Sequence, residues 1–249
     1  MTVPFLTTSD ITKAVGVHVN TVRLYEEWGF LPPVTRAANG YRQFTQRHLN
    51  QIRLTRLALV GPYPGSKQPV LDLVRCGAAG DLGGALEHAY HYLAQIRAER
   101  VRAETATMLL EHWLKGATIS ATHQPLTIKQ AAKLVGMHMD TLRSWERNGL
   151  LTIPRHPDNQ YRQYGANEIA RIRVIRMLRD AGYSTMTILR LIQHIDQHGS
   201  DIDVWRILNT PTPQEEVFSA SDQYMTTIAA QEQRALDIIK LIETQISQA

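Results

Sequence analysis

The sequence has a single cysteine, Cys76, and it lacks long apolar runs. One cysteine cannot form a disulfide framework, a thiolate metal cluster or a paired redox switch within the chain. No stretch approaches the ~18 unbroken apolar residues of a membrane-spanning helix. Residues 1–5 lack the charged start and apolar core of a signal peptide. We therefore expect a cytoplasmic protein that does not contact a membrane.

The sequence also lacks clustered acid, base and nucleophile residues and a glycine-rich phosphate loop. We therefore expect neither an enzyme nor a bound cofactor. Ten histidines are present, but His88, His91 and His112 have no matching acidic or cysteine partners. His194 and His198 form an i, i+4 pair at the end of an expected helix, where such a pair is usually solvated. No metal site is expected.

Positive charge is concentrated in two stretches of the chain. Residues 1–58 hold seven Lys/Arg against three Asp/Glu, and residues 126–180 hold ten against five. Residues 181–249 hold four Lys/Arg against nine Asp/Glu. Basic segments attached to an acidic remainder are typical of a polyanion-binding module on a scaffold.

These basic stretches belong to an internal repeat, in which residues 6–74 recur as residues 126–194 without gaps. We call residues 6–74 the first copy and residues 126–194 the second copy. Retained pairs include Arg23 with Arg143 and Glu26 with Glu146. A period of 120 residues is too long for a solenoid repeat, so the sequence indicates a duplicated domain.

Each copy predicts two short helices joined by a tight turn, followed by a small β-wing. In the first copy, the first helical pattern follows Thr8-Ser9 and ends at Gly16, residues 17–20 form the turn, and the second helix runs from Thr21 to about Trp28. Asn39-Gly40 predicts the hairpin turn of the wing, and Pro157–Gln160 replaces it in the second copy. Thr45 is the expected N-cap of a third helix, and Ser184 that of a fourth helix in the second copy.

A long helix with one apolar stripe follows each copy. We expect a mainly α fold with small β-wings, in which the two long helices pair antiparallel. The expected segments are 1–66 (first winged-helix domain), 67–84 (connecting helical segment), 85–116 (long helix), 117–125 (linker), 126–195 (second winged-helix domain), 196–213 (connecting segment) and 214–249 (C-terminal long helix). The expected core residues are Val15, Val22, Leu31, Ile52, Val135, Leu142, Leu151 and Ile172.

Residues Thr21–Leu31, followed by Asn39–Phe44, resemble the winged-helix DNA-binding domain of MerR-family transcription regulators. Thr141–Leu151 with Gln160–Tyr164 is a looser match. The resemblance implies binding to double-stranded DNA at a promoter or operator, with RNA polymerase as a second partner, and a nucleoid-associated location. Family members are homodimers whose long helices pair antiparallel. Because this chain carries two domains, our preferred interpretation is a single-chain pseudo-dimer, with a homodimer of chains left open.

The start of the second helix enters the major groove in a helix-turn-helix. The expected base-reading residues are His18, Asn20, Thr21 and Arg23, and His138, Asp140, Thr141 and Arg143. The histidines have a second interpretation as helix caps. Asn can pair with adenine, whereas Asp accepts from cytosine and repels phosphate, so we expect two different half-sites.

Further contacts with the DNA backbone are expected from the wings and neighbouring helices. These residues are Tyr25, Arg36, Tyr41, Arg42, Arg56, Trp145, Arg155, Tyr161, Arg162 and Arg176. Tyr41 and Tyr161 could instead form the wing core, and Arg56 and Arg176 could be plain exposed charges.

Two alternatives use the same domains differently. A small-molecule sensor or sequestering protein would bind a drug-like effector in an aromatic pocket, formed by Tyr90, Trp113, Trp205, Phe218 and Tyr224 with Tyr92 beside them. The two tryptophans are also consistent with simple packing. An architectural or recombination-directing DNA binder would use similar winged helices without a promoter.

Overall fold

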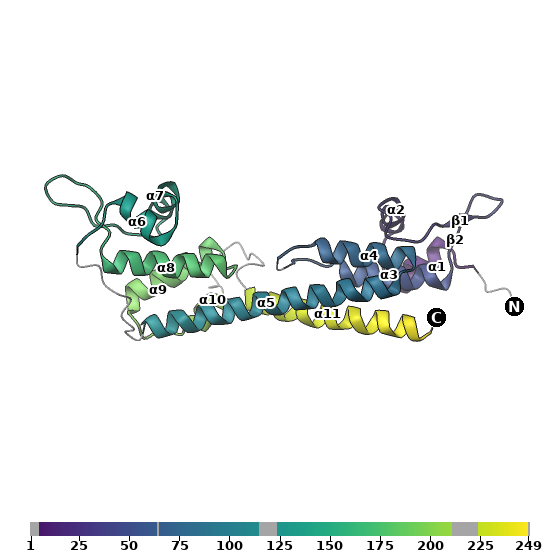
Figure 1. Cartoon of the computed structure of the whole chain (residues 1–249). Coiled ribbons are helices and arrows are strands. Elements are labelled where there is room, and N and C mark those ends of the chain that lie inside the picture. Colours follow the sequence, from purple (N-terminus) through teal and green to yellow (C-terminus); the bar gives the residue numbers. More distant parts are fainter. Residues whose placement is uncertain (1–4, 64, 115–123, 211–223, 249) are drawn as a thin grey trace. The chain divides into compact units, whose positions relative to one another are not determined.

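The computed structural model describes residues 5–63, 65–114, 124–210 and 224–248 (Figure 1). The first copy and the helix after it contain α1 (Thr8–Val15), α2 (Val19–Glu27), β1 (Thr35–Arg36), β2 (Arg42–Gln43), α3 (Gln46–Ala58), α4 (Gln68–Ala79) and α5 (Leu82–Leu114). The second copy and its extension contain α6 (Ile128–Val135), α7 (Met139–Arg147), α8 (Ala166–Asp180), α9 (Thr185–His198), α10 (Val204–Asn209) and α11 (Tyr224–Ser247). The mainly α fold class is confirmed. No helix in these ranges is long and apolar enough to cross a membrane.

Matching side chains begin the first helix of both copies. The Thr7 N–H donates to Asp10 Oδ2 at 2.8 Å, and the Asp10 N–H donates back to Thr7 Oγ1 at 3.2 Å. Thr127 and Gln130 make the same capping box before α6. Gly16 and Gly136 end these helices in the left-handed conformation, with φ of 64° and 65°. Local sequence therefore sets both ends of α1 and α6.

The turn of the helix-turn-helix is shorter than the sequence predicts. The helix α2 begins at Val19 rather than Thr21, so Val19 and Asn20 belong to its first turn. His18 is the N-cap, and its Nδ1 accepts from the Asn20 N–H at 3.2 Å, which confirms the capping interpretation for His18. His138 has the same N-cap position without a side-chain capping bond.

The first wing is a two-stranded antiparallel sheet, in which Thr35 pairs with Gln43 and Arg36 with Arg42. In the described second copy the wing is reduced to a single bridge between Arg155 and Arg162. Ser184 caps α9 as predicted, since its Oγ accepts from the Thr187 N–H at 3.0 Å. All eight predicted core residues are buried, with at most 6% of their surface exposed.

The chain divides into two compact units. The first unit comprises residues 1–98 and 228–249, and the second unit comprises residues 99–227. Each unit thus contains one copy of the repeat together with parts of both long helices.

Within the first unit, α5 and α11 run antiparallel, as predicted. The Tyr90 hydroxyl donates to Glu243 at 3.2 Å, whereas Arg97, two turns further along α5, pairs with Glu232 at 2.8 Å. The helix α5 begins at Leu82 rather than at the expected residue 85. The expected connecting segment 67–84 therefore contains both α4 and the start of α5. The first part of the expected C-terminal helix, residues 214–223, lies outside the described residues.

Candidate nucleic-acid interface

The start of the second helix of each helix-turn-helix is open to solvent. His18, Asn20 and Arg23 are exposed in the first copy, and Thr21 is partly buried. The same holds in the second copy for His138, Asp140 and Arg143, with Thr141 partly buried. Both copies therefore present the side chains that sequence analysis assigns to base contacts.

The two arginines of these helices have different surroundings. Arg143 Nη1 lies 2.9 Å from Asp140 Oδ1, forming an i, i+3 ion pair. Arg23 has no hydrogen-bond or ion-pair partner within the part of the chain that the structure describes. Sequence reasoning missed this pair, although the i, i+3 spacing on a helix is a recognisable signal.

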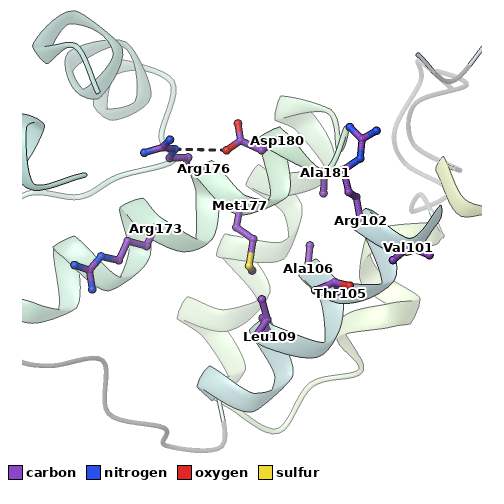
Figure 2. Close-up of a pocket in the computed structure, with 10 residues that line it drawn as sticks. All are labelled: Val101, Arg102, Thr105, Ala106, Leu109, Arg173, Arg176, Met177, Asp180 and Ala181. Carbon is purple, nitrogen blue, oxygen red and sulfur yellow. Dashed lines mark ion pairs between the residues drawn. The ribbon is translucent and has the colours of Figure 1, made fainter. Parts of the chain in front are cut away.

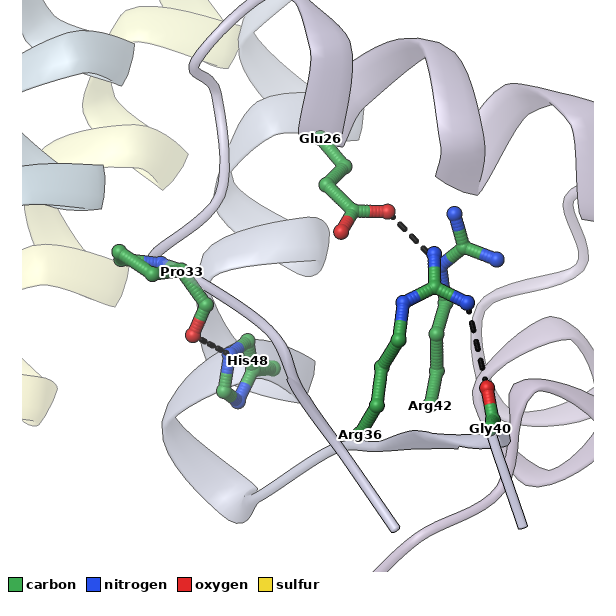
Figure 3. Close-up of polar contacts among 6 residues, drawn as sticks. All are labelled: Glu26, Pro33, Arg36, Gly40, Arg42 and His48. Carbon is green, nitrogen blue, oxygen red and sulfur yellow. Dashed lines mark hydrogen bonds and ion pairs between the residues drawn. The ribbon is translucent and has the colours of Figure 1, made fainter. Parts of the chain in front are cut away.

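Figure 3 shows how the first wing is fastened to α2. Arg42 Nε lies 2.8 Å from Glu26 Oε2, and both side chains are largely buried. Arg36 Nη1 donates to the Gly40 carbonyl at 3.2 Å across the wing turn. The ion pair of Arg42 holds the wing against α2, and its expected contact with DNA stays a prediction.

The second copy repeats this arrangement with one carboxylate serving two arginines. Glu146 pairs with Arg162 at 2.6 Å and with Arg155 at 3.6 Å. Hydrogen bonding to Glu146 raises the pKa of the Arg162 guanidinium. Arg162 thus also holds its wing against α7, and its expected contact with the DNA backbone stays a prediction.

The tyrosines at the two wing tips point away from the protein. Tyr41 is 75% exposed and Tyr161 is 74% exposed, so the alternative that they form the wing core is wrong. Their N–H groups donate to Asn39 Oδ1 and Asn159 Oδ1, at 3.2 Å and 3.0 Å. Both rings remain available for contact with a ligand.

The aromatic residues on the second helices lie deeper. Tyr25 is 8% exposed, and its ring contacts Phe30 with centroids 6.3 Å apart. Burial raises the pKa of the Tyr25 hydroxyl. Tyr25 is therefore buried in the first copy, whereas Trp145 is partly buried, and the phosphate contacts expected of both stay predictions.

Arg56 and Arg176 support the first helix of each copy. Arg176 Nη1 donates to the Val135 carbonyl at the end of α6, and its Nε lies 3.5 Å from Asp180. Arg56 lies against Gly16 at the end of α1, where an added Cβ would be 3.2 Å from Arg56 Nη1. The positive guanidinium complements the carbonyl end of a helix. Both arginines are exposed, so the alternative of a plain exposed charge stays open for Arg56, whereas Arg176 is held by the Val135 carbonyl and Asp180.

A buried histidine, missed by sequence reasoning, holds the base of the first wing. The Thr45 N–H donates to His48 Nδ1 at 3.0 Å, and His48 Nε2 lies 3.3 Å from the Pro33 carbonyl (Figure 3). Burial lowers the pKa of His48, which favours the neutral ring with its proton on Nε2. In the second copy the Gly165 N–H donates to Glu168 instead, at 2.9 Å.

The model of the MerR family of helix-turn-helix regulatory proteins matches residues 6–59 and residues 126–195. The chain belongs to this family.

Curated relatives resemble parts of this MerR-family chain. It is 39% identical over 69 residues to the HTH-type transcriptional regulator CueR of Salmonella typhi, which covers 28% of this chain and 44% of the relative. CueR of Escherichia coli O6:H1 is 46% identical over 50 residues, which covers 20% of this chain and 37% of that protein.

The mercuric resistance operon regulatory protein of Pseudomonas fluorescens is 34% identical over 68 residues, covering 27% of this chain and 47% of the relative. The match therefore spans less than half the length of each of these relatives. No solved structure matches the chain significantly. The matched family and these relatives are regulators of transcription or of an operon rather than enzymes.

The described aromatic residues expected to form a drug-binding pocket are divided between the two compact units. Tyr90 and Tyr92 belong to the first unit, whereas Trp113, Trp205 and Tyr224 belong to the second. Tyr224 is buried against Tyr183, with ring centroids 5.4 Å apart, and Trp205 is 54% exposed. Phe218 lies outside the described residues.

A groove of about 500 Å³ is instead present in the second unit, between α5 and α8 (Figure 2). Its apolar lining includes Ala106, Leu109 and Met177, and Arg173 and Asp180 lie at its edge. Of the expected aromatic pocket residues, the four that the structure describes (Tyr90, Trp113, Trp205 and Tyr224) do not line it. Within the described ranges, no group of three or more His, Cys, Asp or Glu residues is arranged to hold a metal ion.

Proposed function

We propose that this chain binds double-stranded DNA in a sequence-specific manner and regulates transcription. The observation that carries the proposal is the presence of two MerR-type helix-turn-helix domains, each exposing the polar and basic start of its second helix. Side chains at this position reach base edges when such a helix lies in the major groove.

The residues for base contacts are His18, Asn20, Thr21 and Arg23 in the first copy, and His138, Asp140, Thr141 and Arg143 in the second. The exposed Tyr41, Tyr161 and Arg36 would contact the sugar-phosphate backbone. Asn20 and Asp140 offer different hydrogen-bonding groups at matching positions, so the preferred DNA site consists of two different half-sites.

We further propose that one chain forms the equivalent of a dimer. Tyr92 donates to Gln231 at 2.7 Å in the first unit, and Tyr224 donates to Glu99 at 3.4 Å in the second. Tyr224 stands 132 residues after Tyr92, and Gln231 stands 132 residues after Glu99. Each long helix therefore donates one hydrogen bond to the other and accepts the corresponding bond in return. Reciprocal contacts of this kind are the pattern of a two-fold interface.

Matching ring contacts extend this internal symmetry. Tyr63 contacts Tyr92 with ring centroids 6.4 Å apart, and Tyr183 contacts Tyr224 at 5.4 Å. Tyr183 stands 120 residues after Tyr63, the same offset as the repeat itself. These paired contacts support the proposed domain organisation, with winged-helix domains at residues 1–66 and 126–195 and a long helix after each.

The function is tested by selecting duplexes from a random library with the full chain, followed by fluorescence anisotropy on the selected duplex. We expect an imperfect palindrome, and we expect Arg23→Ala to weaken binding roughly 10- to 100-fold. Binding should also weaken steeply with added salt, because arginine contacts release counterions. Equal affinity for selected and scrambled duplexes would refute sequence-specific binding.

The pseudo-dimer is tested by light scattering of the free protein and of its DNA complex. One chain has a mass of 28.2 kDa, and the proposal requires this mass for the free protein and one chain per duplex. A mass twice as large would indicate a homodimer with four DNA-binding domains. Promoter location of genomic sites would distinguish a regulator, which also engages RNA polymerase, from an architectural DNA binder.

A further inference from the structure

We infer that the two DNA-binding domains contribute unequally, because Asp140 neutralises Arg143 in the second copy, whereas Arg23 has no partner among the described residues. This inference rests on the proposed function and adds to it a division of roles. The first copy supplies most of the affinity, and the second copy adds a weaker contact whose strength is set by Asp140.

The central observation is the ion pair on α7. Arg143 Nη1 and Asp140 Oδ1 are 2.9 Å apart, and the carboxylate side chain is 88% exposed. Both residues lie in the part of the helix that would face the bases, so their opposite charges cancel at the DNA-facing surface. The nearby cations Arg155 and Arg162 pair with Glu146 rather than with Asp140, so they do not compete with Arg143 for the Asp140 carboxylate.

The first copy provides a matched comparison on nearly the same backbone. The N-caps His18 and His138 have φ/ψ of −73°/151° and −76°/144°. Asn20 occupies the position of Asp140 and carries no charge, and Arg23 has no partner in the described part of the chain. The different pairing of Arg23 and Arg143 therefore follows from the side chain at this one position.

The ion pair acts through DNA repulsion rather than through its own strength. An exposed ion pair contributes little to stability, so Arg143 can leave Asp140. When Arg143 turns toward a phosphate, however, the Asp140 carboxylate is left unpaired beside a polyanion. Coulomb repulsion between that carboxylate and the phosphates then offsets the attraction gained by Arg143.

The experiment is a double-substitution cycle in the full chain, measured by anisotropy. Because Asp140 is itself a proposed base-contact residue, each chain is measured on the duplex selected by the parent and on the duplex selected by Asp140→Asn. We expect Arg143→Ala alone to weaken binding less than roughly 3-fold, against 10- to 100-fold for Arg23→Ala. Asp140→Asn should tighten binding about 5- to 10-fold at low salt and increase the salt dependence by about one released counterion. In the Asp140→Asn background, Arg143→Ala should then weaken binding by about 10-fold.

Asn20→Asp is the matched control in the first copy. It should weaken binding and also reduce the effect of Arg23→Ala, reproducing in the first copy the behaviour of the second. Asp140 lies in the first turn of α7, where a negative charge stabilises the helix, so Asp140→Asn could also change folding stability. Thermal unfolding of every variant shows whether a change in affinity reflects such a change in folding.

The outcomes separate the inference from the proposed function. If Arg143→Ala weakens binding of the parent chain as much as Arg23→Ala does, or if folded Asp140→Asn does not bind more tightly, the inference is wrong while the function stands. If neither the parent chain nor Asp140→Asn selects a duplex, the proposed function itself is wrong.

Discussion

The two copies of the repeat agree where side chains hold the fold and differ where side chains face solvent. The pairs Glu26–Arg42 and Glu146–Arg162 fasten each wing, with contacts of 2.8 Å and 2.6 Å. On the exposed face of the second helix, by contrast, Asn20 is replaced by Asp140. Exposed positions can change with little effect on folding, so a duplicated domain can acquire two binding specificities on one framework.

The same helix face also differs in its apolar side chains. Leu24 is 39% exposed and Trp28 is 53% exposed in the first copy. The matching residues of the second copy are Ser144 and Asn148, which are polar. An exposed leucine can contact thymine methyl groups in the major groove, so this difference also favours the first copy as the stronger DNA-binding domain.

The largest change in stability should come from substituting the matched core residues Ile52 and Ile172, which are both 0% exposed. Ile52→Ala and Ile172→Ala should each lower the free energy of unfolding by about 2–5 kcal/mol, through lost burial and a new cavity. Hydrogen exchange by mass spectrometry should show faster exchange mainly in the substituted copy. Equal acceleration in both copies would show that the domains unfold as one.

A smaller effect is expected at the wing turns, where the copies differ in backbone strain. Gly40 has φ of 83° and no atom within 4 Å of an added Cβ, whereas Gln160 has φ of 58°. Left-handed backbone is unfavourable for a residue with a side chain, so Gln160→Gly should stabilise the second copy by about 1 kcal/mol, and Gly40→Ala should destabilise the first by a similar amount. Urea denaturation measures both, and a destabilising Gln160→Gly would contradict this account.

The smallest predicted change in stability is caused by pH, and we expect it only in the first copy. Because burial lowers the pKa of His48 in the folded state, the unfolded state binds the proton more readily. Stability should therefore be complete above the usual histidine pKa of about 6.5, and should fall as the pH drops from there toward the lower folded pKa. Protonation would also place a hydrogen on Nδ1, where the Thr45 N–H now donates.

His48→Gln is the control for this pH dependence. Hydrogen exchange of residues 45–58, compared above and below pH 6.5, should show a loss of protection in the parent chain and a weaker loss in His48→Gln. An unchanged pH dependence in the variant would assign the effect to another group.

Much of the fold was predictable because its signals are local. Capping threonines, glycines at helix ends and apolar periodicity lie within a few residues of the elements they define. The start of α2 was placed two residues late, because Val19 and Asn20 are poor helix formers that the capping histidine recruits into the first turn. Boundaries of this kind depend on a single hydrogen bond.

The roles of individual arginines were less predictable. Arg42 and Arg162 were expected to contact DNA, but their ion pairs with Glu26 and Glu146, 16 residues away in sequence, were not predicted. Sequence spacing does not show which charged groups meet after folding. Sequence spacing also does not show that Tyr90 and Trp205 belong to different compact units.

The amino-acid sequence by itself determined the duplication, the helix-turn-helix and wing of each copy, and the buried face of every predicted core helix, because these depend on short-range periodicity and caps. Only the tertiary structure decided which polar groups are paired. The bond from Tyr92 to Gln231 joins residues 139 positions apart, and such contacts form only when apolar burial has brought distant helices together.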